Sequence, residues 1–250
     1  MARFSYHPQL QAGTTVRLSR EESCHLKAQR LYPGSPLFLS DGKGRVFRGT
    51  VQQDDGREKL VTVEEQLSMQ VPPYRLRVCQ AILHNQARMD WLVEKLVELG
   101  ATEICFFIAH HSVPDISHRK IRRLERIVVE ACKQSGRAFF PTLRSFLEWE
   151  IFKEFLANEN GLVLVCEPAA SATLTETLRE EKISECSLLI GPEGDFTDRE
   201  KTELGNINRS VFVKLTNTVL RSETAALYAA CLTMSFLEKM DEDCPENFWL

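Results

Sequence analysis

The sequence predicts an α/β protein whose parallel sheet follows a smaller β-rich domain. From about residue 74, continuous apolar runs alternate with stretches in which apolar residues recur at helical spacing, as in a parallel sheet covered by helices. Before that point, short strand-like runs are separated by Asp-Gly and Lys-Gly turns. Pro72-Pro73 lies between the two patterns, and proline does not continue a sheet. We therefore predict one domain over residues 1–71 and a second over residues 74–250.

Composition excludes several classes of protein. No apolar run approaches the roughly 20 residues that a membrane helix needs, and the start, MARFSYHP, lacks the apolar core of a secretion signal. The eight cysteines are scattered singly, without a Cys-x-x-Cys pair, which argues against a zinc site and fits reduced thiols in a cytosol. We expect a cytoplasmic protein without a metal. The net charge of −4 does not indicate nucleic-acid binding, so any basic surface must be local.

The first domain is predicted to be a small β-barrel. Its expected strands cover residues 16–18, 37–39, 46–51 and 60–63. Ser19 with Glu22 has the spacing of a capping box and predicts a short helix through about Arg30. Basic residues outnumber acidic ones in this segment, which by itself fits a solvated surface as well as an RNA-binding face.

The second domain is predicted to alternate strands with helices. Strands are expected over residues 76–82, 103–109, 162–166, 187–191 and 211–215, and helices over 89–99, 119–137, 146–157 and 225–237. Two more helices are expected after Thr173 and Thr197, because each is followed three residues later by a glutamate that completes a capping box. We interpret His110 and His111 as loop residues, since adjacent side chains on an extended segment point to opposite faces.

Two strand-to-helix loops lie close together in the sequence. Gly191-Pro192-Glu193-Gly194 follows the first apolar run, and Arg221-Ser222-Glu223-Thr224 follows the second and leads into a good helix former. Glycine allows a backbone to approach a ligand closely, and the carboxyl ends of parallel strands are where α/β proteins bind ligands. By themselves, such loops are more often ordinary α/β turns.

The stretches IGPEGDF and VLRSETAA together resemble the paired motifs of the RsmE family of ribosomal RNA small-subunit methyltransferases. EACKQSGRAFFP, including Arg137, resembles a third motif of that family. The resemblance implies a SPOUT-type domain with a trefoil knot, preceded by a PUA-like β-barrel that binds RNA. It also implies a homodimer that uses S-adenosylmethionine to methylate N3 of a uridine in 16S ribosomal RNA.

The resemblance assigns cofactor binding to backbone groups of three loops. In this sequence those loops contain Cys166, Glu167, Ile190, Gly191, Pro192, Glu193, Gly194, Leu215, Thr216, Val219 and Leu220. The candidates for RNA contact are Arg3, Arg17 and Arg30 of the first domain and Arg137 of the second.

Methylation of N3 requires that the uracil N3 proton leave, so the site needs a base or a cation that stabilises the uracil anion. Arg221 and Glu223 are the charged residues nearest to the loops in sequence, and we predict them to be catalytic. A structural Arg221–Glu223 ion pair that only fixes the loop is the alternative.

Some positions depart from the family pattern. Asp195 stands where the family usually has a second glycine, and Thr216-Asn217-Thr218 replaces a stretch that usually contains glycine and arginine. A non-catalytic RNA-binding or assembly factor with the same fold is therefore the alternative function. A phosphate cradle in a nucleotide-using enzyme is disfavoured, because the sequence has no Walker-type Gly-x-x-x-x-Gly-Lys-Ser/Thr stretch.

Overall fold

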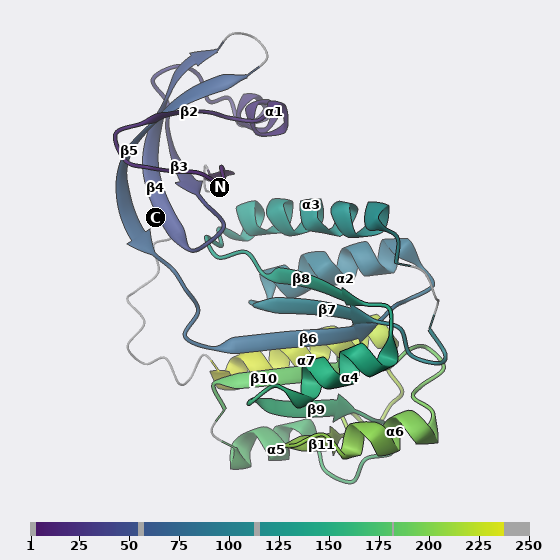
Figure 1. Ribbon diagram of the computed structural model, residues 1–250. Coiled ribbons are helices and arrows are strands. Elements are labelled where there is room, and N and C mark those ends of the chain that lie inside the picture. The colour runs from purple at the N-terminus through teal and green to yellow at the C-terminus, as the bar shows by residue number, and fades with distance from the viewer. Residues whose placement is uncertain (1–3, 55–57, 113–115, 182, 238–250) are drawn as a thin grey trace. The chain divides into compact units, whose positions relative to one another are not determined.

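The computed structural model describes residues 4–54, 58–112, 116–181 and 183–237, which fall into two compact units (Figure 1). The first unit contains the described residues up to 72 together with 129–140, and the second contains residues 73–128 and those from 141 on. Residues 129–140, which the sequence analysis places in the second domain, thus group with the first unit. The candidate Arg3 and the acidic carboxyl-terminal tail lie outside the described residues.

The first unit is built on a five-stranded sheet of order β1-β3-β4-β5-β2. Its strands are β1 (Phe4–Tyr6), β2 (Thr15–Arg17), β3 (Pro36–Ser40), β4 (Arg45–Asp54) and β5 (Lys59–Met69). The β1–β3 pair is parallel and the others are antiparallel. The four expected strands are present, and β1 is an addition. Closure of this sheet into a PUA-like barrel remains a prediction.

Helix α1 (Arg20–Ala28) begins as expected but with only half of the predicted capping box. The Ser19 hydroxyl accepts a hydrogen bond from the Glu22 amide at 3.2 Å. The Glu22 carboxylate does not return the bond, because it accepts instead from the Tyr6 amide at 3.2 Å and from the Lys133 ammonium at 2.6 Å. Both side chains of the Glu22–Lys133 pair are buried. This pair joins residues that are far apart in sequence within the first unit.

The second unit contains a six-stranded sheet of order β11-β9-β10-β6-β7-β8, in which every pairing is parallel. The strands are β6 (Arg75–Ala81), β7 (Glu103–Phe107), β8 (Thr142–Phe146), β9 (Leu162–Cys166), β10 (Glu185–Ile190) and β11 (Ser210–Val213). The predicted α/β class with a parallel sheet is confirmed. Strand β8 is not among the expected strands, because it is short, largely polar and mostly solvent-exposed, so it lacks a continuous apolar run.

Helices cover both faces of this sheet (Figure 1). They are α2 (Gln86–Glu98), α3 (His118–Ser135), α4 (Trp149–Ala157), α5 (Leu174–Glu180), α6 (Asp198–Gly205) and α7 (Ser222–Leu237), and α3 continues into the first unit. Both predicted capping boxes are present, at Thr173–Glu176 and Thr197–Glu200. Among the described residues, no helix combines the length and apolarity needed to cross a bilayer.

The two faces are packed by different helices. Figure 1 shows α4 in front of the sheet and α7 behind it. On the α4 face, Phe152 stacks on Phe107 of β7 with ring centroids 4.2 Å apart. On the other face, Ala226, Ala229 and Ala230 of α7 are completely buried within the chain, and α7 contacts β6 and β10. These alanines therefore belong to the core of the second unit rather than to an exposed interface.

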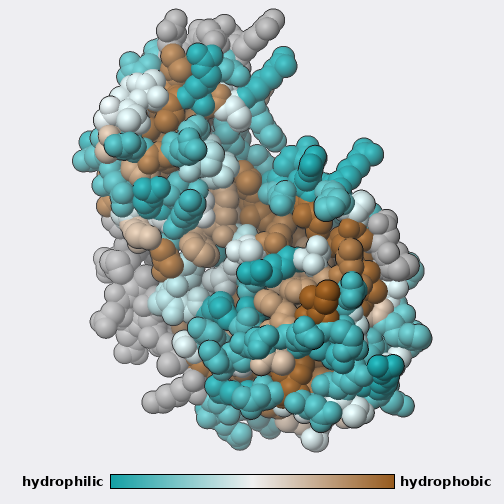
Figure 2. All heavy atoms as spheres, in the orientation of Figure 1, coloured by the Kyte–Doolittle hydropathy of each residue, from teal (hydrophilic) through white to brown (hydrophobic). Residues whose placement is uncertain are grey.

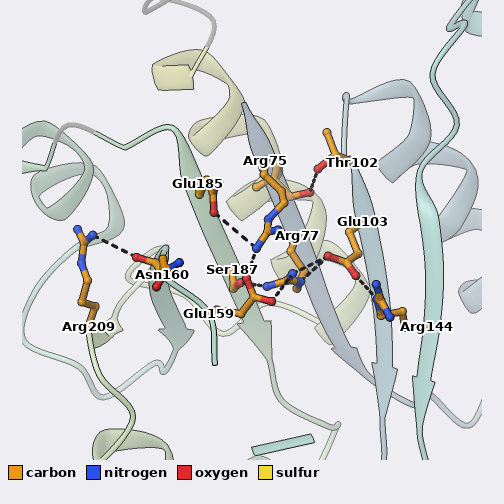
Figure 3. Close-up of polar contacts among 11 residues, drawn as sticks. Arg75, Arg77, Thr102, Glu103, Arg144, Glu159, Asn160, Glu185, Ser187 and Arg209 are labelled. Carbon is orange, nitrogen blue, oxygen red and sulfur yellow. Dashed lines mark hydrogen bonds and ion pairs between the residues drawn. The ribbon is translucent and has the colours of Figure 1, made fainter. Parts of the chain in front are cut away.

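A buried ionic network lies on the α4 face (Figure 3). The Arg77 guanidinium of β6 donates to Glu103 of β7 at 2.7 Å, to Glu159 at 2.9 Å and to the Ser187 hydroxyl of β10 at 2.9 Å. Burial acts to lower the pKa of Arg77, but the hydrogen bond to Glu159 and the charge of Glu103 outweigh it, so the pKa is raised. The network thus links three adjacent strands and the segment after α4.

Arg77→Met should lower the free energy of unfolding by about 3 kcal/mol, because it removes the buried cation that Glu103 and Glu159 share and leaves them only Arg144 and Arg75 at the edge of the network. Urea denaturation followed by tryptophan fluorescence measures this change. Arg209→Met is the matched control: Arg209 pairs with Glu181 at 3.1 Å with both side chains exposed, so we expect a loss below about 1 kcal/mol. Equal losses in the two variants would show that the network does not stabilise the sheet.

Candidate functional site

Three loops leave the parallel sheet from the same edge. In the strand register, Ile190 at the end of β10 and Val213 at the end of β11 both lie opposite Cys166 at the end of β9. The loops that follow these residues are the three that the sequence analysis assigns to cofactor binding. The structure therefore brings together segments that are up to about fifty residues apart in the chain.

The first loop is anchored to its neighbour. The Glu167 amide donates to the Val213 carbonyl at 3.0 Å, and the Glu167 carboxylate accepts from the Ala169 amide at 3.2 Å. Cys166 is buried, and burial raises the pKa of its thiol to about 12. Because the thiol stays neutral at pH 7, Cys166 contributes an uncharged side chain rather than a thiolate nucleophile.

The second loop, Gly191–Gly194, is closely packed at both of its glycines. A Cβ added at Gly191 would lie 3.1 Å from the Phe196 ring, and one at Gly194 would lie 3.0 Å from Cβ of His111. The amide of Asp195 closes the turn by donating to the Pro192 carbonyl at 3.0 Å. Pro192 is buried, whereas Glu193 and Gly194 are exposed. The loop thus presents backbone to solvent where a larger side chain would not fit.

Asp195 adopts the left-handed backbone conformation that glycine favours, with φ at +62°. Its carboxylate contacts the Lys201 ammonium of α6 at 2.9 Å, and Lys201 also contacts Glu167 at 2.6 Å. Burial alone would lower the pKa of Lys201, but its hydrogen bonds to Glu167 and Asp195 raise it. The residue that departs from the family pattern is therefore held by an ion pair that also links the first and second loops.

The third loop, residues 215–220, is exposed at its centre, over residues 217–219. The Thr216 hydroxyl donates to the Thr218 carbonyl at 2.7 Å, which makes a local turn. Leu215 and Leu220 are half-buried, while Val219 is 87 % exposed. An apolar side chain with that exposure is available for contact with a ligand or another surface.

The Ser222 hydroxyl connects α7 to two strand ends. It accepts a hydrogen bond from the Gln80 side chain at 2.7 Å and donates to the Gly191 carbonyl at 2.7 Å. Gln80 is fully buried at the end of β6, in register with Ile190. The start of α7 is thereby fixed against the second loop.

The two residues predicted to be catalytic lie in different environments. Arg221 is exposed, and among the described residues no ion-pair partner of its side chain is found. Glu223 is buried and its Oε1 atom lies 3.5 Å from Nε of Arg88 on α2. Arg88 also contacts Glu193 at 3.2 Å. Glu223 is thus paired with Arg88, and the alternative of a structural Arg221–Glu223 ion pair has no support in the described part of the chain.

The arginines predicted to contact RNA are distributed over the first unit. Arg17 is exposed and pairs with Glu58 at 3.2 Å. Arg30 is exposed and adopts a left-handed conformation with φ at +57° just after α1. Arg137 is half-buried, and its amide donates to the Cys132 carbonyl at 2.9 Å.

No group of histidine, cysteine and acidic side chains suited to hold a metal ion occurs among the described residues. His110 and His111 lie in a turn, as expected. The ring of His111 donates through Nδ1 to the Asp195 carbonyl at 3.0 Å, so it supports the second loop.

The sequence analysis did not assign Arg88, Lys201, Gln80 and His111 to the site. Arg88, Gln80 and His111 contact the site from elements that are distant in sequence, and Lys201 reaches Asp195 and Glu167 from the helix that follows the second loop; no local motif marks any of them. The strand periodicity offered one signal, because Gln80 is a polar residue within a buried strand.

Comparison with known proteins supports the same assignment. Residues 70–234 match the family model described as RNA methyltransferase domain. Ribosomal RNA small subunit methyltransferase E from Synechocystis sp. is 29 % identical over 230 residues, covering 90 % of this chain and 74 % of the relative. The protein of the same name from Mycobacterium bovis is 28 % identical over 227 residues, covering 87 % and 85 %.

A solved structure agrees over both units. The crystal structure of a ribosomal RNA small subunit methyltransferase E from Neisseria gonorrhoeae, bound to S-adenosylmethionine, is 25 % identical in sequence. It superposes with a TM-score of 0.81 and covers 94 % of this chain and 98 % of that one. The resemblance seen in the two loop motifs is confirmed, and the chain belongs to the RNA methyltransferase family that includes the ribosomal RNA small subunit methyltransferases E.

Proposed function

We propose that this protein transfers a methyl group from S-adenosylmethionine to N3 of a uridine in the 16S ribosomal RNA of the small subunit, in the cytoplasm. The observation that carries the proposal is the meeting of three loops, after β9, β10 and β11, at one edge of the sheet. The relative from Neisseria gonorrhoeae was solved with S-adenosylmethionine, which supports the choice of cofactor.

The residues at this edge fit such a cofactor. Cys166, Glu167, Ile190, the Gly191–Gly194 turn, Leu215, Thr216, Val219 and Leu220 would hold it, largely through backbone groups. Phe196 and His111 leave no room for a side chain at Gly191 or Gly194, and the turn is exposed at Glu193 and Gly194, so its backbone is accessible there. When bound, the cofactor supplies an activated methyl group on a sulfonium leaving group.

Arg221 and Glu223 are proposed to act on the uracil base. The exposed guanidinium of Arg221, at the start of α7, would stabilise the negative charge that develops on uracil as its N3 proton leaves. Glu223 lies at the same helix end and would accept a proton or hydrogen bond from the base. Arg17, Arg30 and Arg137, with Arg3 outside the described residues, are proposed to bind RNA phosphates.

We also propose the domain structure and the oligomeric state that the family resemblance implies. The proposed domains are a PUA-like RNA-binding barrel over residues 1–71 and a SPOUT methyltransferase domain over residues 74–250, with a trefoil knot. Insertion of β10 between β9 and β6 supports a complex chain path in that domain. A homodimer is proposed from the family resemblance, and the exposed apolar side chains of the third loop (Val219), α2 (Trp91) and α7 (Tyr228) support it. Figure 2 shows the side of the molecule on which α4 lies, where hydrophobic side chains also reach the surface among hydrophilic ones.

A methylation assay tests the function directly. We expect the purified protein to bind S-adenosylmethionine in calorimetry and to transfer its labelled methyl group to unmodified small-subunit RNA or particles, giving 3-methyluridine on nucleoside analysis. Cofactor binding without methyl transfer to either substrate would favour the alternative of a non-catalytic RNA-binding or assembly factor. The ion-paired Asp195 in place of a glycine is the feature that favours that alternative.

Arg221→Lys separates a catalytic from a structural role of this side chain, because lysine keeps the charge and loses the planar fork. We expect kcat to fall by about two orders of magnitude, the scale of losing one preorganised electrostatic contact. The affinity for S-adenosylmethionine, measured by calorimetry, should change little. Near-normal turnover, or a loss explained entirely by weaker cofactor binding, would contradict the catalytic role.

The double variant Arg17→Gln/Arg30→Gln tests RNA binding by the first unit. Each lost phosphate contact should reduce the slope of log Kd against log salt by about 0.7–0.9. RNA affinity measured by filter binding at several salt concentrations should therefore fall most at low salt, while cofactor affinity is retained. Arg209→Gln, an exposed arginine at the amino end of β11, is the control. Equal effects of the double variant and the control would argue against this RNA surface.

A further inference from the structure

Arg88 lies where the two sequence motifs of the site meet. It belongs to the first turn of α2, and the side chain of Asn85 caps this turn by accepting hydrogen bonds from the amides of Ala87 and Arg88. The cap fixes the backbone from which the Arg88 side chain extends. One guanidinium then contacts two carboxylates, with Nη1 at 3.2 Å from Glu193 and Nε at 3.5 Å from Glu223.

The two carboxylates belong to segments that must be aligned for the proposed reaction. Glu193 lies in the turn after β10, and Glu223 lies in the first turn of α7. Ser222 links the same two segments through the Gly191 carbonyl, but that is a single uncharged hydrogen bond. A guanidinium presents donors in a rigid planar fork, so it can fix the relative position of two carboxylates in a way that a flexible ammonium cannot.

The environment of Glu223 shows what this arrangement leaves available. The residue is only 6 % exposed, and its Oε2 atom is buried without a hydrogen-bond partner among the described residues. A buried carboxylate oxygen without a partner is costly, so such atoms generally meet a donor when the site is complete. Arg88 occupies the side of the carboxylate that carries Oε1 and leaves Oε2 for another donor.

We propose that Arg88 is a positioning residue of the methyltransferase site. By holding Glu193 and Glu223 together, it aligns the Gly191–Gly194 turn with α7 and directs Oε2 of Glu223 toward an N–H donor of the bound nucleotide. This inference rests on the proposed function and deepens it, since it assigns to the site a residue outside the loops that carry the family motifs. Arg88 acts through Glu223 rather than on the RNA itself.

A double-mutant cycle tests this role. Arg88→Gln should lower kcat about 10- to 100-fold, the scale of a misaligned reacting group, with KM for RNA within about twofold of the wild-type value. Combined with Glu223→Gln, it should cause no more than about a twofold further loss, because two residues that act through one contact are not additive. Arg199→Gln is the control, because it removes only the ion pair of the exposed Arg199 with Glu203 within α6. Its effect on kcat should be the same in the wild type and in Glu223→Gln.

Hydrogen exchange supplies a readout that does not depend on activity. In Arg88→Gln, peptides covering residues 190–196 and 220–227 should exchange faster than in the wild type, while Arg199→Gln should leave them unchanged. Faster exchange in a protein whose wild type transfers no methyl group would contradict the proposed function and still support the linking role. The inference would be overturned if exchange in Arg88→Gln were unchanged, if the losses of kcat in Arg88→Gln and Glu223→Gln multiplied in the double variant, and if KM for RNA rose. Arg88 would then be a direct RNA contact.

Discussion

The site depends on one constraint, which is the parallel register of β9, β10 and β11. Because Cys166 lies opposite both Ile190 and Val213, the three loops leave the sheet at the same level. Side chains then preserve this alignment above the sheet. The Ser222 hydroxyl connects Gln80 to the Gly191 carbonyl, and Lys201 connects Glu167 to Asp195. A shift of one residue in any of these strands would separate the loops and also turn buried side chains to the opposite face.

Local sequence patterns predicted most of the strands and helices of the second unit. Continuous apolar runs identified five of its six strands, and both capping boxes identified helix starts, because these features are local in sequence. Strand β8 was missed, since its polar residues at an exposed sheet edge give no apolar run. Of the capping box predicted at Ser19, only the hydrogen bond to the Ser19 hydroxyl is present, because the Glu22 side chain pairs with Lys133 instead. That pairing joins residues 111 positions apart, and no local pattern can report it.

At the candidate site, too, features that are local in sequence could be predicted and contacts between distant residues could not. The loops were predicted because glycine, proline and the strand ends lie next to one another in sequence. Arg88 was not, because it meets Glu193 and Glu223 only after the sheet has formed, and the same holds for the contact of Lys201 with Glu167. Asp195 illustrates the limit most clearly: the sequence marks it as a departure from a glycine, while the structure shows that it keeps the backbone conformation of a glycine. That conformation costs about 1 kcal/mol or more for a residue with a side chain, and the Asp195 carboxylate is held by Lys201 and by the Phe196 amide, which donates to it at 2.8 Å.

The charges at this edge of the sheet would act differently on a cofactor with a positive sulfonium and on a negatively charged RNA strand. Four carboxylates, Glu167, Asp195, Glu193 and Glu223, meet two cations, Lys201 and Arg88. The cluster is therefore negative by two charges, which favours a cofactor that carries a positive sulfonium and opposes a phosphate backbone. Arg221 is the cation nearest in sequence to the cluster whose side chain has no ion-pair partner among the residues described. Under the proposed function, an RNA strand would meet attraction at Arg221 and repulsion from the carboxylates beside it. That contrast would draw the target nucleotide to the start of α7 and keep the remaining phosphates away from the cofactor loops.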